Sequence, residues 1–240
     1  MSKVSPGAKI HLIAIGGAVM HNLALDLQSA GYLVSGSDGR IDEPARGRLA
    51  TAGLLPEPMG WDASRITPDL DTVVLGMHAK ADNPELQRAL ELGIRVCSFP
   101  ELVGEMTAHQ QRLVVAGSHG KTTVTSMVMH ALRFHGINFD YLVGSAMPGY
   151  ERMVQLGTKA AAVVLEGDEY LSSALDPRPK MSHYNPHATV ITGIAWDHIN
   201  VFPTRESYEN VFADYIRSLE SGAVLIYFEE DPILARLVQE

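Results

Sequence analysis

Short apolar runs alternate with longer segments of helical spacing along nearly the whole chain. The first run, residues 9–16, is almost entirely apolar, which is typical of a parallel strand buried on both faces. Strands are expected at residues 9–16, 33–36, 72–77, 94–97, 112–116, 160–165, 189–194 and 223–228. Helices are expected at residues 19–30, 45–52, 84–92, 100–107, 122–135, 205–219 and 232–240. This alternation predicts an α/β fold with parallel sheets.

Two domains follow from this pattern, with a boundary near residue 108. Residues 1–108 are predicted to form a Rossmann-like domain with a parallel sheet. Residues 109–240 are predicted to form a P-loop ATPase-type central domain that is incomplete. Within the second domain, residues 141–144 read as a short strand or loop. Residues 145–158, rich in Gly, Pro and Met, read as a mobile loop.

The first βαβ unit carries a glycine turn. Gly16 and Gly17 follow the first strand, and Asp38 follows the second strand about 20 residues later. That layout is typical of dinucleotide-type folds, where the acid binds a ribose hydroxyl. Ala14 and Val19 stand where glycines are expected, so binding of a hydride cofactor has little support.

A second glycine turn lies between the strand at 112–116 and the helix at 122–135, and we name it the phosphate loop. Its residues are Gly117, Ser118, His119, Gly120, Lys121, Thr122 and Thr123. Backbone N–H groups in such a loop face the phosphates, and the helix N-terminus adds partial positive charge. Lysine then reaches the β- and γ-phosphates, and the next hydroxyl ligates Mg²⁺. The bland alternative is a strand–helix turn with a surface lysine, and the flanking elements favour the phosphate loop.

Polar residues end two further strands. Glu166 follows one strand, placed like the carboxylate that holds Mg²⁺ in phosphate-loop enzymes, and Asp197 and His198 follow another. Ligands in open parallel sheets bind beyond the carboxyl ends of the strands, so these groups are expected to converge. Each group has a bland alternative. His198 would be a structural residue, Asp197 would cap the following turn, and Asp168 and Glu169, which follow Glu166, would be solvated acids of a turn.

Composition narrows the class of partner. The net charge is −9 with no basic stripe, which argues against nonspecific binding to nucleic acid or an anionic membrane. No apolar run has membrane length, and residues 1–7 do not resemble a signal peptide. Cys97 is the single cysteine, so an internal disulfide is excluded and a reducing cytoplasm is the simplest location. Its strand context predicts burial.

At this point the sequence resembles the Mur ligase family, the ATP-dependent enzymes that build the peptide of peptidoglycan. The matching stretches are residues 10–17, 35–38, 83–86, 117–123, 166–170 and 196–198. The resemblance is to the branch that uses UDP-N-acetylmuramate itself. It implies three domains, so the chain looks like an N-terminal fragment, expected to be inactive by itself.

The resemblance also implies a reaction and roles for residues. The lactyl carboxylate of UDP-N-acetylmuramate attacks ATP to give an acyl phosphate, which an amine then attacks. Lys121 neutralises the transferring group, Thr122 and Glu166 hold a first Mg²⁺, and His198 binds a second cation. The UDP-substrate would be held by Gly16, Gly17, Met20, Ser37 and Asp38.

The sequence leaves the acceptor and two alternative functions open. Residues 166–170 and 183–186 look more like the murein peptide ligases, which join the tripeptide L-Ala-γ-D-Glu-meso-diaminopimelate, than like the L-alanine-adding ligases. A module that binds UDP-sugar or nucleotide without chemistry is an alternative from another class. A nicotinamide-dependent oxidoreductase rests on the first βαβ unit alone and leaves the phosphate loop unexplained.

Overall fold

The first sheet is built from four parallel strands. The computed structural model describes residues 5–157, 159–197, 199 and 201–239. The strands, in the spatial order β2-β1-β3-β4, are β1 (Lys9–Ile13), β2 (Leu33–Ser37), β3 (Thr72–Leu75) and β4 (Arg95–Ser98). Their connections contain α1 (Ala18–Ser29), α2 (Ala45–Thr51), the 3₁₀ turn η1 (Ala63–Arg65) and α3 (Pro84–Glu91). The central strands β1 and β3 are almost wholly buried, as expected for strands covered on both faces.

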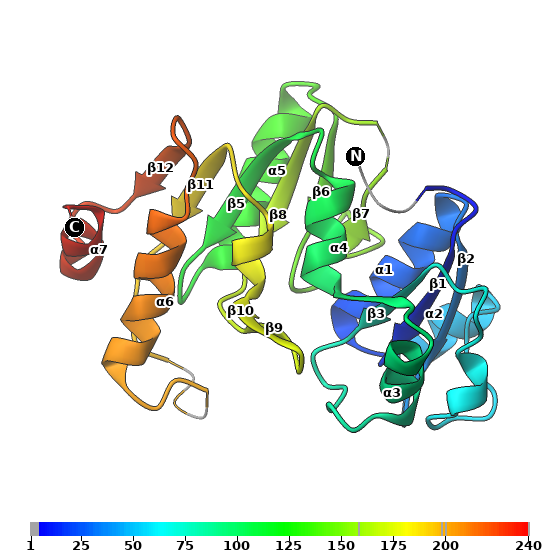
Figure 1. Cartoon of the computed structure of the whole chain (residues 1–240). Coiled ribbons are helices and arrows are strands. Elements are labelled where there is room, and N and C mark those ends of the chain that lie inside the picture. The colour runs from blue at the N-terminus through cyan, green and yellow to red at the C-terminus, as the bar shows by residue number, and fades with distance from the viewer. Residues whose placement is uncertain (1–4, 158, 198, 200, 240) are drawn as a thin grey trace.

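The second sheet has six strands in the order β12-β11-β5-β8-β6-β7. They are β5 (Gln111–Ala116), β6 (Phe139–Leu142), β7 (Val154–Gln155), β8 (Ala162–Glu166), β11 (Ala188–Ile191) and β12 (Val224–Tyr227). All pairings are parallel except that of β6 with β7. Its helices are α5 (Lys121–Phe134), α6 (Arg205–Arg217) and α7 (Pro232–Gln239). Figure 1 shows β12 and α7 at the end of this sheet away from the first sheet.

Local sequence sets where the helices begin. The Asn83 carboxamide accepts hydrogen bonds from the N–H groups of Glu85 and Leu86, and Pro84 follows it, so α3 starts there. Thr204 and Ser207 cap each other's backbone N–H groups at the start of α6.

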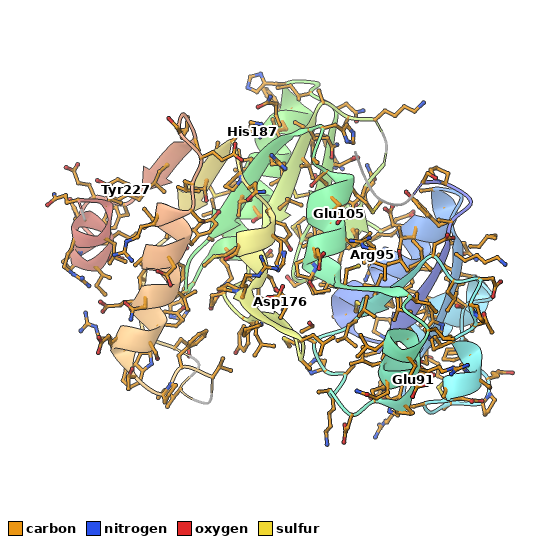
Figure 2. All side chains as sticks on the ribbon, in the orientation of Figure 1. Glu91, Arg95, Glu105, Asp176, His187 and Tyr227 are labelled. Atoms are coloured by element: carbon orange, nitrogen blue, oxygen red, sulfur yellow. The ribbon has the colours of Figure 1, made fainter. Side chains whose placement is uncertain are left out.

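A helix and a hairpin connect the two sheets. Helix α4 (Phe99–Met106) leads from β4 towards β5. It packs against the hairpin of β9 (Leu171–Ser173) and β10 (Asp176–Pro179) and against η2 (Lys180–His183). Packing is so close that a Cβ at Gly104 would lie 2.3 Å from the His183 carbonyl oxygen. Figure 2 shows Arg95 of β4 beside Glu105 of α4, and their side chains form an ion pair of 2.6 Å.

Helix α1 is joined to the edge of the second sheet by polar side chains. Asn22 Oδ1 accepts from the N–H of Met153 at 3.0 Å, and Asp26 Oδ2 accepts from the N–H of Leu156 at 2.9 Å. Both side chains are buried. The first helix of one sheet therefore satisfies the backbone around β7 of the other.

Most predicted elements are confirmed, and the α/β class with them. The strand expected at 9–16 ends at Ile13, because Ala14 adopts φ +66° in the left-handed region. The segment expected to be a loop, 145–158, instead contains β7 and buries Met147 and Met153. The hairpin β9–β10 was not expected. The boundary near residue 108 stays a prediction.

Two smaller findings follow. Cys97 is buried in β4, as expected. Among the described residues, no helix is long and apolar enough to cross a membrane.

Candidate active site

Two glycines give the phosphate loop its shape. Gly117 has φ +126°, and a Cβ there would lie 2.2 Å from Thr192 Oγ1. Gly120 has φ +79° and stands immediately before α5. Both are conformations that side chains rarely adopt, so the turn depends on glycine at these positions. The Thr192 hydroxyl also donates to the His119 carbonyl at 2.6 Å, which fixes the loop to the end of β11.

Lys121 is folded back into the loop. Its Nζ donates to the Gly117 carbonyl at 2.7 Å and to Glu169 Oε2 at 2.9 Å. The Glu169 side chain is completely buried. The reading of Glu169 as a solvated acid is therefore wrong, because it forms a buried ion pair with the loop lysine. Asp168 is not a simple solvated acid either, since it pairs with Lys180 at 2.5 Å.

Thr122 and Glu166 meet across the carboxyl ends of β5 and β8. The Thr122 hydroxyl donates to Glu166 Oε1 at 2.9 Å, and the N–H of Gly144 donates to Glu166 Oε2 at 3.1 Å. The convergence predicted for the phosphate loop and Glu166 is thus observed. A hydroxyl and one carboxylate beside a phosphate loop fit Mg²⁺, which keeps waters and takes its other ligands from phosphates. Within the described part of the chain, no group of three His, Cys, Asp or Glu side chains could hold a metal by itself.

The third predicted group consists of Asp197 and His198, and only Asp197 is among the described residues. His198, expected to bind a second cation, is outside the described residues. Asp197 is half-buried, and its charge contributes to raising the pKa of Tyr208. The backbone before it contacts the phosphate loop, because the N–H of Ala195 donates to Ser118 Oγ at 2.8 Å.

Two residues of this site were missed by the sequence analysis. The Tyr208 hydroxyl, from α6, lies 2.8 Å from Ser118 Oγ and 3.2 Å from Glu169 Oε1. Burial, with the nearby carboxylates, raises the pKa of Tyr208, so it stays a neutral donor. Thr192 is the other. A tyrosine on an amphipathic helix gives no signal that distinguishes it from a core residue.

The loop residues differ in exposure. Ser118 is buried, whereas His119 and Thr123 are exposed at the rim. The assignment of these three residues to phosphate binding stays a prediction.

The turn after β1 borders a cavity of about 630 Å³. Gly16 and Gly17 line it, and the N–H of Gly16 donates to Asp38 Oδ2 at 2.8 Å. Arg40 and Arg48 line the same cavity, together with the carboxylates of Asp38, Asp42 and Glu43. Ser37, predicted to lie near the ribose or uracil, is not among the lining residues; it is fully buried and donates to Glu85.

A second cavity, of about 240 Å³, lies between the two sheets. Gly17 and Met20 line one side, and Glu166, Asp168 and Lys180 line the other. Two groups of residues predicted separately, one for each sheet, therefore border the same space.

These features define an α/β protein with a phosphate loop facing a second glycine turn. Residues 115–240 match the family model described as the Mur ligase middle domain, and residues 9–111 match the model described as the Mur ligase family, catalytic domain. The chain belongs to the Mur ligase family.

Two curated relatives carry the same name. A UDP-N-acetylmuramate–L-alanine ligase of Nocardioides sp. is 32% identical over 231 residues, which is 96% of this chain and 49% of that protein. The enzyme of the same name from Mycobacterium tuberculosis is 33% identical over 235 residues, 96% of this chain and 46% of that protein. The chain spans about half the length of the curated relatives it matches.

Solved structures of high similarity include both kinds of ligase. The UDP-N-acetylmuramate:L-alanyl-γ-D-glutamyl-meso-diaminopimelate ligase from Neisseria meningitides has a TM-score of 0.88 at 28% identity, covering 97% of this chain and 75% of that one. The UDP-N-acetylmuramate-alanine ligase from Thermotoga maritima has a TM-score of 0.74 at 26% identity, covering 95% and 51%. The two-sheet architecture is therefore that of known Mur ligases.

Proposed function

We propose that this chain is the UDP-sugar- and ATP-binding part of an ATP-dependent ligase that forms an amide on UDP-N-acetylmuramate. One observation carries the proposal: Lys121, Thr122 and Glu166 lie together beyond the carboxyl ends of β5 and β8, and Glu166 faces Gly17 and Met20 across one cavity. A nucleotide on one sheet and a diphosphate-linked sugar on the other would then meet in that space.

The proposed reaction has two steps. The lactyl carboxylate oxygen attacks the γ-phosphorus of ATP, the bond to the β-phosphate oxygen breaks, and ADP leaves. The amine of the acceptor then attacks the acyl carbon, loses a proton, and displaces phosphate. Both early reactants are anions, so charge neutralisation is the main task of the protein.

Each site residue has a part in this proposal. Lys121 would leave the Gly117 carbonyl and donate to the transferring phosphoryl group, while the Glu169 carboxylate remains beside the Lys121 ammonium. Thr122 and Glu166 are placed to hold Mg²⁺, which when bound supplies further neutralisation of phosphate charge. The N-terminus of α1, with Gly16 and Gly17, would bind the UDP diphosphate, and Asp38 would keep that turn in shape.

We propose the tripeptide L-Ala-γ-D-Glu-meso-diaminopimelate as the acceptor. Support comes from the Glu166–Tyr170 stretch and from the TM-scores of 0.88 and 0.83 to two murein peptide ligases, including that of Psychrobacter arcticus, at 28% and 27% identity. L-alanine is the second candidate, favoured by the names of the curated relatives.

The test is a ligation assay on the intact gene product. UDP-N-acetylmuramate, ATP and Mg²⁺ are supplied with either the tripeptide or L-alanine, and phosphate release and product mass are measured. Ligation of the tripeptide supports the proposal, and ligation of L-alanine alone replaces the acceptor but keeps the reaction. If UDP-N-acetylmuramate binds but neither acceptor leads to phosphate release, the non-catalytic module is favoured.

A further inference from the structure

Lys180 is a buried cation in the cavity between the two sheets. Its side chain is only 9% exposed, although lysine is rarely found inside proteins. The hairpin β9–β10 brings it there: the N–H of Lys180 donates to the Tyr170 carbonyl at 2.9 Å, and the N–H of Met181 donates to the Asp168 carbonyl at 3.1 Å. The unexpected hairpin thus returns the chain to the end of β8, where Glu166 lies.

The ammonium of Lys180 has more N–H donors than the described residues around it accept. Within the described part of the chain it donates one side-chain hydrogen bond, to Asp168 Oδ2 at 2.5 Å, and it lies 5.5 Å from the ring centroid of Phe99 and 5.8 Å from that of Tyr170. An ammonium carries three N–H donors. Burial of a charged group with unfilled donors is costly, and a ligand that accepts from it repays that cost.

The place of Lys180 suggests what that ligand is. Among the described residues lining the 240 Å³ cavity, it is the only lysine or arginine. The same cavity is bordered by Gly17 on the α1 side and by Glu166 on the phosphate-loop side. A UDP-sugar whose diphosphate lies at α1 must pass its sugar through this space to bring a carboxylate to the phosphate loop.

We propose that Lys180 binds the lactyl carboxylate of the sugar and thereby selects a carboxylate-bearing UDP-sugar over the counterpart that lacks this carboxylate. This inference rests on the proposed function. Asp168 is the positioning residue that holds the ammonium, and the Phe99 and Tyr170 rings keep water from it. The cation would also lower the repulsion between the carboxylate and the phosphates of ATP.

The experiment compares two UDP-sugars that differ by the lactyl group. Affinities of the intact gene product for UDP-N-acetylmuramate and UDP-N-acetylglucosamine are measured by calorimetry without ATP or metal. A charge-assisted hydrogen bond predicts a preference of about tenfold or more for UDP-N-acetylmuramate in the unaltered protein. Lys180→Met should abolish this preference while the affinity for UDP-N-acetylglucosamine stays within about twofold. Lys180→Arg should keep part of the preference. Lys159→Met, which removes an exposed lysine outside the cavity, is the matched control and should change nothing.

Each result has one meaning. A preference that survives in Lys180→Met, or equal affinities in the unaltered protein, overturns the inference and leaves the proposed function standing. An equal loss of both affinities in Lys180→Met means a structural role and also overturns it. If Lys180→Met does not fold, by circular dichroism, Lys180→Gln replaces it with the same criteria. Failure of the unaltered protein to bind either UDP-sugar is instead a failure of the proposed function.

Discussion

The two glycine turns of this protein occupy the same topological place and differ in chemistry. Each follows a central strand that pairs in parallel with both of its neighbours, and each begins a helix, β1 to α1 in one case and β5 to α5 in the other. The first turn of α1 contains no charged side chain, whereas α5 starts with Lys121 and Thr122 facing two carboxylates. Backbone N–H groups suffice to hold a diphosphate, but phosphoryl transfer needs charge that can neutralise the reacting group.

Their backbones differ in a corresponding way. In the second turn the left-handed conformations fall on Gly117 and Gly120. In the first turn the left-handed residue is Ala14, and Gly16 is held instead by the Asp38 carboxylate. The first turn thus has its left-handed conformation on an alanine, and the Asp38 carboxylate helps to fix it.

The strongest test of the comparison is Lys121→Met. If only the second turn performs chemistry, phosphate release by the intact gene product should fall by about 100-fold or more, because one preorganised donor to the transferring group is lost. Affinity for UDP-N-acetylmuramate, measured by calorimetry, should stay within about twofold. Lys159→Met is the control for charge alone. Near-normal turnover in Lys121→Met would remove the functional distinction between the two turns.

Alanine substitutions at the two glycines of the second turn should separate the cost of a steric clash from the cost of backbone strain alone. Gly117→Ala places a Cβ 2.2 Å from Thr192 Oγ1 and 2.9 Å from its backbone nitrogen, at φ +126°. We expect the free energy of unfolding to fall by about 2 kcal/mol and ATP affinity to fall about tenfold. Gly120→Ala, with no atom within 4 Å of its Cβ, should cost only the strain of φ +79°, about 1 kcal/mol. Urea unfolding and nucleotide titration measure both, and equal losses would contradict the packing argument.

The sequence specified the second turn better than the first. Glycine, lysine and hydroxyl spacing depend on local chemistry, so the turn at residues 117–123 and its contact with Glu166 could be predicted from the chain alone, while their role in binding ATP and Mg²⁺ stays a prediction. The sequence could not predict the contacts of Glu169 and Tyr208, because these join segments that lie 39 to 90 residues apart in the chain. It could not predict the position of Lys180 either, because that position depends on the unexpected hairpin. The end of β1 was placed three residues too late, since apolar Ala14–Gly16 look like strand until the turn is seen.

Substitutions in the first turn should affect the other ligand. Asp38→Ala removes the acceptor of the Gly16 N–H, which leaves the turn without the contact that fixes it. Affinity for UDP-N-acetylmuramate should fall about tenfold, while ATP affinity should not change measurably. Asp42→Ala, an exposed acid on the same cavity, is the matched control. Loss of ATP affinity in Asp38→Ala would mean that the two turns are not independent.

The smallest change in ligand affinity is expected from a substitution in helix α1, which the first turn begins. The same substitution should change how the free energy of unfolding depends on pH. Helix α1 carries buried polar residues joined to β7, whereas α5 exposes Met127 and Phe134. Burial raises the pKa of Asp26 from its ordinary value of 3.8 to about 7; Asp140 adds to the rise, and the Leu156 N–H and Arg152 oppose it.

Between these two pH values the folded protein keeps a proton that the unfolded chain has lost. Raising the pH from about 4 to about 7 should therefore reduce the contribution of Asp26 to the free energy of unfolding, and this loss should level off above pH 7. Between pH 5 and pH 8 the part due to Asp26 should be about 3 kcal/mol. Asp26→Asn, which keeps an acceptor for the Leu156 N–H, should remove that part of the slope in urea unfolding. It should leave both ligand affinities within about twofold, because Asp26 is not among the described residues that line the cavities beside the two turns. The same slope in both proteins would show that Asp26 titrates normally, and α1 would then be no more sensitive to pH than α5.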